Sequence, residues 1–385
     1  MVEALLVVGL AVAFFVGFNI GGSSTGVAFG PAVGSGAVSK TAAAGLMTLF
    51  FLIGGATFGT EVIETMGGRI VPSGQFTLAA SVTVLFFIGA ALLVSNLFGV
   101  PASTSMTAVG AIAGLGVATQ TIDWSVMGEI VTWWLVAPII AFWLCAVIGR
   151  YLYPYLEASF KLESEGPETT LRERIGTALV LVIACYMAFS AGASNAANAV
   201  APLVGSNEIG VYPGVLLVTL AVGVGAFTIA RRTLDTVGDG LTQLPILAAL
   251  IVETVSATII TFLSQAGIPA SLAVSATMCV VGLGWGRATR TTTLTDAAGA
   301  AVSGPGESET GMSVGALAED DPADTPASDG GQGSVPRIGE ESPDDVTAAD
   351  LFDPSATGRV VMLWIATPTI SAVMSYLVFK FVPFF

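Results

Sequence analysis

The stretch SAGASNAANAVAPLVGS, from Ser190 to Ser206, places small and amide side chains directly after the apolar run ALVLVIACYMAF. That run has the composition of a membrane helix, so the stretch lies where such a helix would continue. Polar groups without partners cannot face lipid, because each one costs several kcal/mol in hydrocarbon. The stretch therefore predicts a broken helix that lines a cavity inside the membrane.

The composition of the whole chain is that of an integral membrane protein. Of its 385 residues, 54% are hydrophobic and 11% are charged, and the mean hydropathy is +0.82. Runs of about 20 apolar residues match the roughly 30 Å hydrocarbon layer. They are apolar on every side, unlike barrel strands, so we expect an all-α polytopic membrane protein. There are ten such runs, at 2–18, 40–58, 75–98, 101–118, 124–148, 174–192, 210–230, 244–263, 267–285 and 360–381.

The charges predict both an insert and an orientation. Fourteen of the 28 acidic residues lie between Asp296 and Asp353, where Arg337 is the one basic residue, and this predicts an acidic disordered insert at 290–358. If every run crosses the membrane once, 11 of the 13 Lys and Arg residues fall on one side. The positive-inside rule makes that side cytoplasmic. We therefore expect a multi-pass protein of the cell membrane with a cytoplasmic insert and with both termini outside.

Two segments recur and divide the chain into halves. GVPASTSMTAVGAIAGLG at 99–116 returns as GIPASLAVSATMCVVGLG at 267–284, and WLVAP at 134–138 returns as WIATP at 364–368. Because each half holds five predicted crossings, an odd number, the second copy should be inverted relative to the first. The expected parts are repeat 1 at 1–150, a cytoplasmic link at 151–173, repeat 2 at 174–289, the insert at 290–358 and the last helix of repeat 2 at 359–385.

Several classes of function are excluded by what the chain lacks. There is no histidine, and the three cysteines lie far apart inside apolar runs, so we expect no metal site, no disulfide and no His-based catalysis. GSGAVSKT at 34–41 has the length of a P-loop, but Ser39 replaces the second glycine. We expect neither an enzyme nor a cofactor, and no nucleic acid as a partner.

Polar motifs occupy matching places in the two halves. GGSSTGVAFGPAVGSGAVS at 21–39 corresponds to the opening stretch, and Pro-Ala-Ser opens an apolar run at Pro101 and again at Pro269. Broken helices direct backbone N–H groups and hydroxyls toward an anion. Small residues also let membrane helices pack closely, which explains any one motif equally well. Four motifs in symmetric positions favour a binding site.

These residues resemble the inorganic phosphate transporters of the PiT type. The family signature G-A-N-D-V-A-N-A is similar to GASNAANA at 192–199, and its continuation F-G-T-S-V-G-S-G is similar to FGPAVGSG at 29–36. PASTSM at 101–106, TVGDGLTQL at 236–244 and Glu253, which precedes Pro269 by sixteen residues, extend the likeness over both halves. The resemblance implies inverted repeats with re-entrant helices, a central oxyanion site and coupling to Na⁺ or H⁺.

Site residues follow from the resemblance position by position. It implies anion contacts from the hydroxyls of the Pro-Ala-Ser motifs, and contacts to anion or cation from the signature, with weaker counterparts in the first half. Glu253, deep in an apolar run, is a further candidate for coupling. The expected substrate-binding residues are Ser103, Thr104, Ser271, Ser194, Asn195, Asn198, Ser23 and Ser24, and those for the coupling ion are Asn195, Asn198 and Glu253.

The signature departs from the family at three positions. Ser24 and Asn195 stand where the family has aspartates, and Val27 replaces an asparagine. An aspartate accepts a hydrogen bond from the P–OH of hydrogen phosphate, so a neutral site suits sulfate at least as well. We expect a secondary active symporter of inorganic phosphate, with a sulfate or other oxyanion permease, or a passive anion channel, as alternatives. A homodimer is left open, since apolar faces toward lipid and toward a second subunit look alike.

Overall fold

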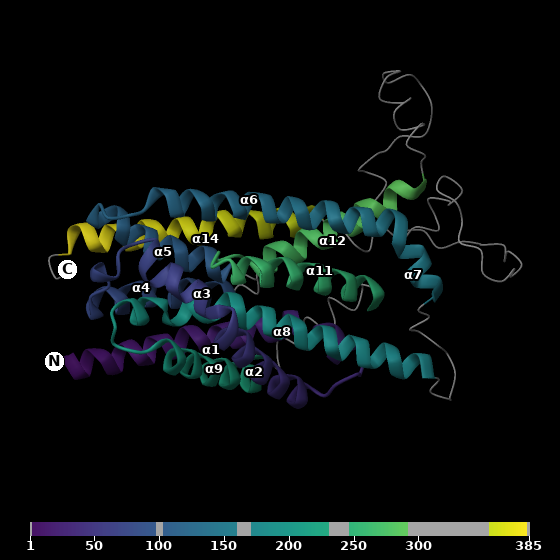
Figure 1. The fold of residues 1–385 in the computed structure, drawn as a ribbon, viewed down its shortest axis with the longest axis horizontal. Coiled ribbons are helices and arrows are strands. Elements are labelled where there is room, and N and C mark those ends of the chain that lie inside the picture. Colours follow the sequence, from purple (N-terminus) through teal and green to yellow (C-terminus); the bar gives the residue numbers. More distant parts are fainter. Residues whose placement is uncertain (1, 98–102, 160–170, 231–245, 292–353, 383–385) are drawn as a thin grey trace, which may run out of the picture.

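The computed structural model describes residues 2–97, 103–159, 171–230, 246–291 and 354–382, and these ranges contain helices and no strand (Figure 1). The all-α prediction is therefore confirmed. The TVGDGLTQL motif, Pro101 and nearly all of the acidic insert lie outside the described residues.

The helices follow the order of the predicted runs. The first half comprises α1 (Val2–Gly34), α2 (Lys40–Thr57), α3 (Gly59–Glu64), η1 (Thr65–Arg69), η2 (Ser73–Gln75), α4 (Leu78–Leu97), α5 (Thr104–Thr119), α6 (Trp124–Val147), η3 (Ile148–Leu152) and α7 (Tyr153–Ser159). The second half comprises α8 (Leu171–Gly205), α9 (Val211–Thr228), α11 (Ile246–Gln265), α12 (Leu272–Ala288), η4 (Thr289–Thr291) and α14 (Pro354–Phe381).

Seven helices in the described part of the chain are long and apolar enough to cross a membrane. They are α1, α2, α6, α8, α9, α11 and α14. By contrast α5 and α12, with 16 and 17 residues, reach only about 24–26 Å, less than the hydrocarbon layer. Helix length therefore supports seven of the ten predicted crossings.

The stretches 21–34 and 191–205 are helical throughout, so the prediction of breaks at these places was wrong. The first belongs to α1 and the second to α8, and the chain reverses only afterwards, at 35–39 and 206–210. Hydroxyl groups bond within the helix instead of interrupting it, as where Thr25 Oγ1 donates to the Gly21 carbonyl at 2.6 Å. A continuous helix satisfies its own backbone, which hydrocarbon requires.

Helices of the first half pack against helices of the second half. The long helix α1 packs along α9, and its counterpart α8 packs along α2; in the same way α5 packs along α14, and α12 along α6. Figure 1 shows α1 and α8 running in opposite directions along the long axis, as do α6 and α14. Each half therefore buries its helices against the other half.

Glycines permit the closest of these contacts. A Cβ on Gly54 of α2 would overlap the Phe189 carbonyl oxygen of α8, and one on Gly192 of α8 would overlap the Phe51 carbonyl oxygen of α2. Gly21 and Gly225 make the corresponding approaches between α1 and α9. Gly21 precedes Gly192 by 171 residues, as Gly54 precedes Gly225. Small residues thus set the helix spacing where hydrocarbon supplies no hydrophobic force.

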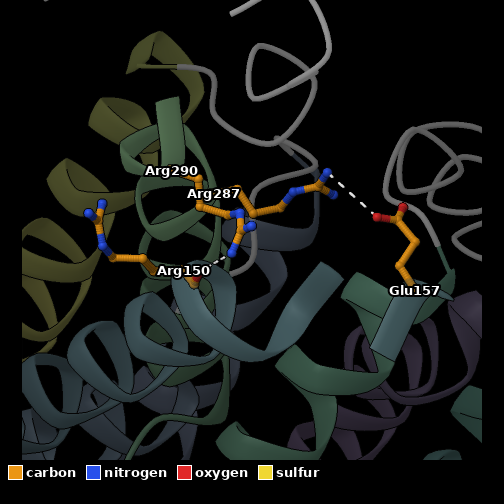
Figure 2. A network of polar contacts seen from close by, with 4 residues as sticks. All are labelled: Arg150, Glu157, Arg287 and Arg290. Atoms are coloured by element: carbon orange, nitrogen blue, oxygen red, sulfur yellow. Dashed lines mark hydrogen bonds and ion pairs between the residues drawn. The ribbon is translucent and has the colours of Figure 1, made fainter. Parts of the chain in front are cut away.

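Arginines tie the far ends of α6 and α12 together (Figure 2). Arg150 donates to the Thr289 carbonyl, and Arg290 Nη1 donates to the Arg150 carbonyl at 2.6 Å. The Arg287 guanidinium lies 4.1 Å from the centre of the Tyr153 ring and 3.9 Å from a carboxylate oxygen of Glu157. Positive charges here face the carbonyl ends of two helices, which favours them electrostatically.

Replacing Gly54 by alanine should lower the free energy of unfolding by about 1–3 kcal/mol, the usual cost of overpacking. Gly128 on α6 is the matched control, since a Cβ there meets nothing within 4 Å. Gly128→Ala should leave stability unchanged or raise it, because alanine favours a helix over glycine. Thermal unfolding of the purified variants in detergent measures both, and equal midpoints would contradict the packing described above.

Candidate functional site

A small cavity of about 40 Å³ lies where the two halves meet. Its walls come from α1 and α5 of the first half and from α8 and the start of α12 in the second. The lining residues are Ser23, Ser24, Val27, Thr104, Ser105, Asn195, Ser271, Leu272 and Ala273. None of these nine side chains carries a charge.

Two helix N-termini open onto the cavity, one from each half. Ser103 is the N-cap of α5, and its hydroxyl accepts from the N–H of Met106 at 3.3 Å. Ser271 is the N-cap of α12 and accepts from the N–H of Val274 at 3.3 Å. Serine in an extended conformation is a favoured N-cap, which explains why both Pro-Ala-Ser motifs start a helix.

The first turns of α5 and α12 leave backbone donors for a ligand. The first four N–H groups of a helix have no acceptor inside it. In α5, Ser103 takes the N–H groups of Met106 and Thr107, which leaves those of Thr104 and Ser105 at the cavity. The equivalent groups of α12 belong to Leu272 and Ala273. Two positive helix ends with free N–H groups form an anion-binding arrangement that needs no cationic side chain.

An amide network closes the cavity on the side of the second half. Asn198 Nδ2 donates to Asn195 Oδ1 at 3.0 Å and to Ser105 Oγ at 3.2 Å, which joins α8 to α5. Asn198 is fully buried, and within the described part of the chain its Oδ1 has no hydrogen-bond partner. Buried acceptors almost always have one.

The structure brings five of the predicted substrate-binding residues to the cavity: Ser23, Ser24, Thr104, Asn195 and Ser271. The other three are buried and are not among the lining residues. Ser103 acts as a helix cap, Ser194 donates to the Ala191 carbonyl at 3.4 Å within α8, and Asn198 holds Asn195 and Ser105.

Glu253 is separate from this site. It lies on α11 with 4% of its surface exposed, and it is not among the residues that line the cavity. Within the described chain neither carboxylate oxygen has a hydrogen-bond partner. The structure therefore does not join Glu253 to Asn195 and Asn198, the other residues predicted to bind the coupling ion.

Four lining residues were not selected from the sequence as binding residues: Val27, Ser105, Leu272 and Ala273. Ser105 carries a visible signal, since it stands in the first turn after Pro101 beside the chosen Ser103 and Thr104. Leu272 and Ala273 carry none, because their contribution is backbone at a helix start. No group of three or more acidic, Cys or His side chains suited to a metal ion occurs among the described residues.

Membrane-length helices around an uncharged cavity, with helix N-termini facing it from both halves, are the architecture of a membrane transporter. The chain belongs to the phosphate transporter family, whose model matches residues 20–375. It is therefore a transporter of that family and not an enzyme, as predicted.

The relatives of this chain include two kinds of permease. It is 30% identical over 271 residues to the sulfate permease CysP of Bacillus subtilis, covering 70% of this chain and 74% of the relative. It is 25% identical over 361 residues to a putative phosphate permease of Haemophilus influenzae, covering 71% and 86%. A solved structure titled "The sodium-dependent phosphate transporter" superposes with a TM-score of 0.67 at 17% identity, over 98% of this chain and 100% of that chain, which shows the fold.

The cap at Ser103 can be tested against its backbone role. Ser103→Ala should lower the free energy of unfolding by about 0.5–2 kcal/mol, because it removes the acceptor for Met106, whereas Ser103→Gly should cost only a few tenths. Thermal unfolding in detergent compares the two variants. If both melt alike, the hydroxyl does not stabilise the start of α5.

Proposed function

We propose that this protein is a secondary active transporter of a tetrahedral oxyanion, with inorganic phosphate as the substrate that family membership supports. The observation that carries the proposal is the meeting of the α5 and α12 N-termini at one cavity. Free backbone N–H groups and the hydroxyls of Ser24, Thr104 and Ser271 would surround the anion. Asn195 would contribute its amide, Ser23 a weaker contact, and Ser103, Ser194 and Asn198 would support these groups from behind.

The proposed mechanism is alternating access by two inverted repeats of five helices each. The packing of helices of one half against those of the other and the opposed directions of α1 and α8 support it. A site between inverted copies can open to either side when one copy rocks against the other. A passive channel would instead need a continuous pore with several weak binding sites.

Coupling to Na⁺ is part of the proposal. The similar solved structure is titled a sodium-dependent phosphate transporter, and the carbonyl oxygen of Asn198 is a buried acceptor without a hydrogen-bond partner among the described residues. The orientation, with both termini outside and the acidic insert cytoplasmic, stays a prediction from the Lys and Arg distribution, as do the boundaries of the five parts of the chain and a homodimer.

Sulfate is the second candidate substrate, and one observation favours it. Among the described residues, no carboxylate lines the cavity. A carboxylate would accept a hydrogen bond from the P–OH of hydrogen phosphate and would repel a fully deprotonated sulfate. A cavity lined by neutral side chains offers no carboxylate to the P–OH group and does not repel sulfate. The sulfate permease named among the relatives is consistent with this reading.

Uptake into proteoliposomes tests the proposal directly. Labelled phosphate and sulfate are supplied separately and in competition, under an inward gradient of Na⁺ or of H⁺. We expect uphill uptake of at least one anion that depends on the imposed gradient. Downhill flux alone would identify a channel, and no flux of either anion under any gradient would refute the assignment.

A charge introduced at Asn195 should change the choice of anion. In Asn195→Asp we expect the ratio of phosphate to sulfate uptake to rise by about tenfold, because the new carboxylate accepts from P–OH and repels sulfate. Asn195→Ala should reduce uptake of both anions. Ser206→Ala, on the turn after α8 and outside the cavity lining, is the control and should transport normally. An unchanged ratio in Asn195→Asp would place the anion elsewhere.

A further inference from the structure

The tryptophans of the two repeated segments WLVAP and WIATP differ in their hydrogen bonds. Trp134, on α6, donates from Nε1 to the Pro269 carbonyl at 2.8 Å. Trp364 stands at the corresponding position on α14. It is 8% exposed, and its Nε1 has no hydrogen-bond partner among the described residues. Two equivalent indole donors are therefore used differently in the two halves.

The carbonyl of Pro269 needs a donor from outside its own segment. The connection from α11 to α12 spans only residues 266–271, and Pro269 within it is buried. Buried carbonyl groups almost always have a hydrogen-bond partner. Trp134 belongs to the first half and Pro269 to the second, so the bond that satisfies this carbonyl joins the two halves.

An apolar cluster holds the Trp134 indole beside both helices that open onto the cavity. Met106, Val274 and Trp364 form this buried cluster, and Trp134 packs against it. Met106 and Val274 are equivalent residues in the first turns of α5 and α12, and their backbone N–H groups bond to the two N-cap serines. The indole therefore lies against the helix starts that supply the backbone donors.

Building on the proposed function, we propose that Trp134 is a positioning residue for the oxyanion site. Its N–H holds the Pro269 carbonyl, two residues before the N-cap of α12, and so fixes the direction of the N–H groups of Leu272 and Ala273. Hydrogen bonds weaken steeply when donor and acceptor are misaligned. Trp134 is not among the residues that line the cavity, so it acts on the anion through α12.

The same Trp→Phe change at the two equivalent positions tests the role of the N–H group. Trp134→Phe should raise the KM for anion uptake by about three- to tenfold, because a buried carbonyl left without a donor is costly and α12 shifts to relieve it. The maximal rate should change much less. Trp364→Phe loses the same ring atoms but no hydrogen bond to a described residue, so it should keep the wild-type KM.

The measurement is uptake of labelled phosphate and sulfate into proteoliposomes over a range of anion concentrations. Loosened packing alone would affect both Phe variants, and thermal unfolding in detergent measures that effect separately. Equal KM values for Trp134→Phe and Trp364→Phe would overturn the inference while leaving the proposed function intact. No uptake by the wild-type protein under any ion gradient would refute the proposed function, and this inference with it.

A second variant at the same position tests whether the donor itself matters. Histidine carries an N–H at the corresponding position of its five-membered ring, and at about pH 8 its imidazole is neutral. Trp134→His should therefore have a KM closer to that of the wild type than Trp134→Phe, although its ring is smaller than either. A KM for Trp134→His as high as that for Trp134→Phe would show that the hydrogen bond does not position α12.

Discussion

The meeting of two helix N-termini inside the protein is the constraint on which the rest of this structure depends. An oxyanion in hydrocarbon needs many hydrogen-bond donors, and a charged side chain there is costly. The starts of α5 and α12 supply backbone donors and the positive ends of two helices without any net charge. Because these helices belong to different halves, the donors converge only when the halves are correctly packed against each other.

That packing depends on glycines and not on bulky apolar side chains. At Gly54 and Gly192 the backbones of α2 and α8 approach so closely that a single methyl group would overlap a carbonyl oxygen. Between α5 and α14, Gly110 and Gly114 make the same kind of approach. These contacts hold the walls of the cavity, so small residues determine the position of the site as much as its polar residues do.

Much of this could be predicted from the sequence, and the failures have physical causes. Hydropathy predicted the apolar helices, and the two Pro-Ala-Ser motifs predicted where α5 and α12 begin. Their serines were expected to contact the anion, whereas Ser103 and Ser271 each accept a backbone hydrogen bond as the N-cap of a helix. The continuity of α1 and α8 could not be predicted. Small and amide residues favour a break when they are considered locally, and neighbouring helices decide whether the backbone stays helical. The position of Glu253 relative to the cavity could not be predicted either, because nothing in the sequence shows that Glu253 lies apart from Asn195.

The arginine contacts at the end of α6 have a mechanical consequence. Arg150, after α6, donates to the Thr289 carbonyl after α12, and Arg290 donates back to the Arg150 carbonyl. Gly282 and Gly286 of α12 fit against the carbonyls of Phe142 and Ala146 of α6. A shift of one turn along the axis, about 5.4 Å, would break all of these contacts at once. A displacement of the cavity end of α12 along the helix axis would therefore have to carry α6 with it.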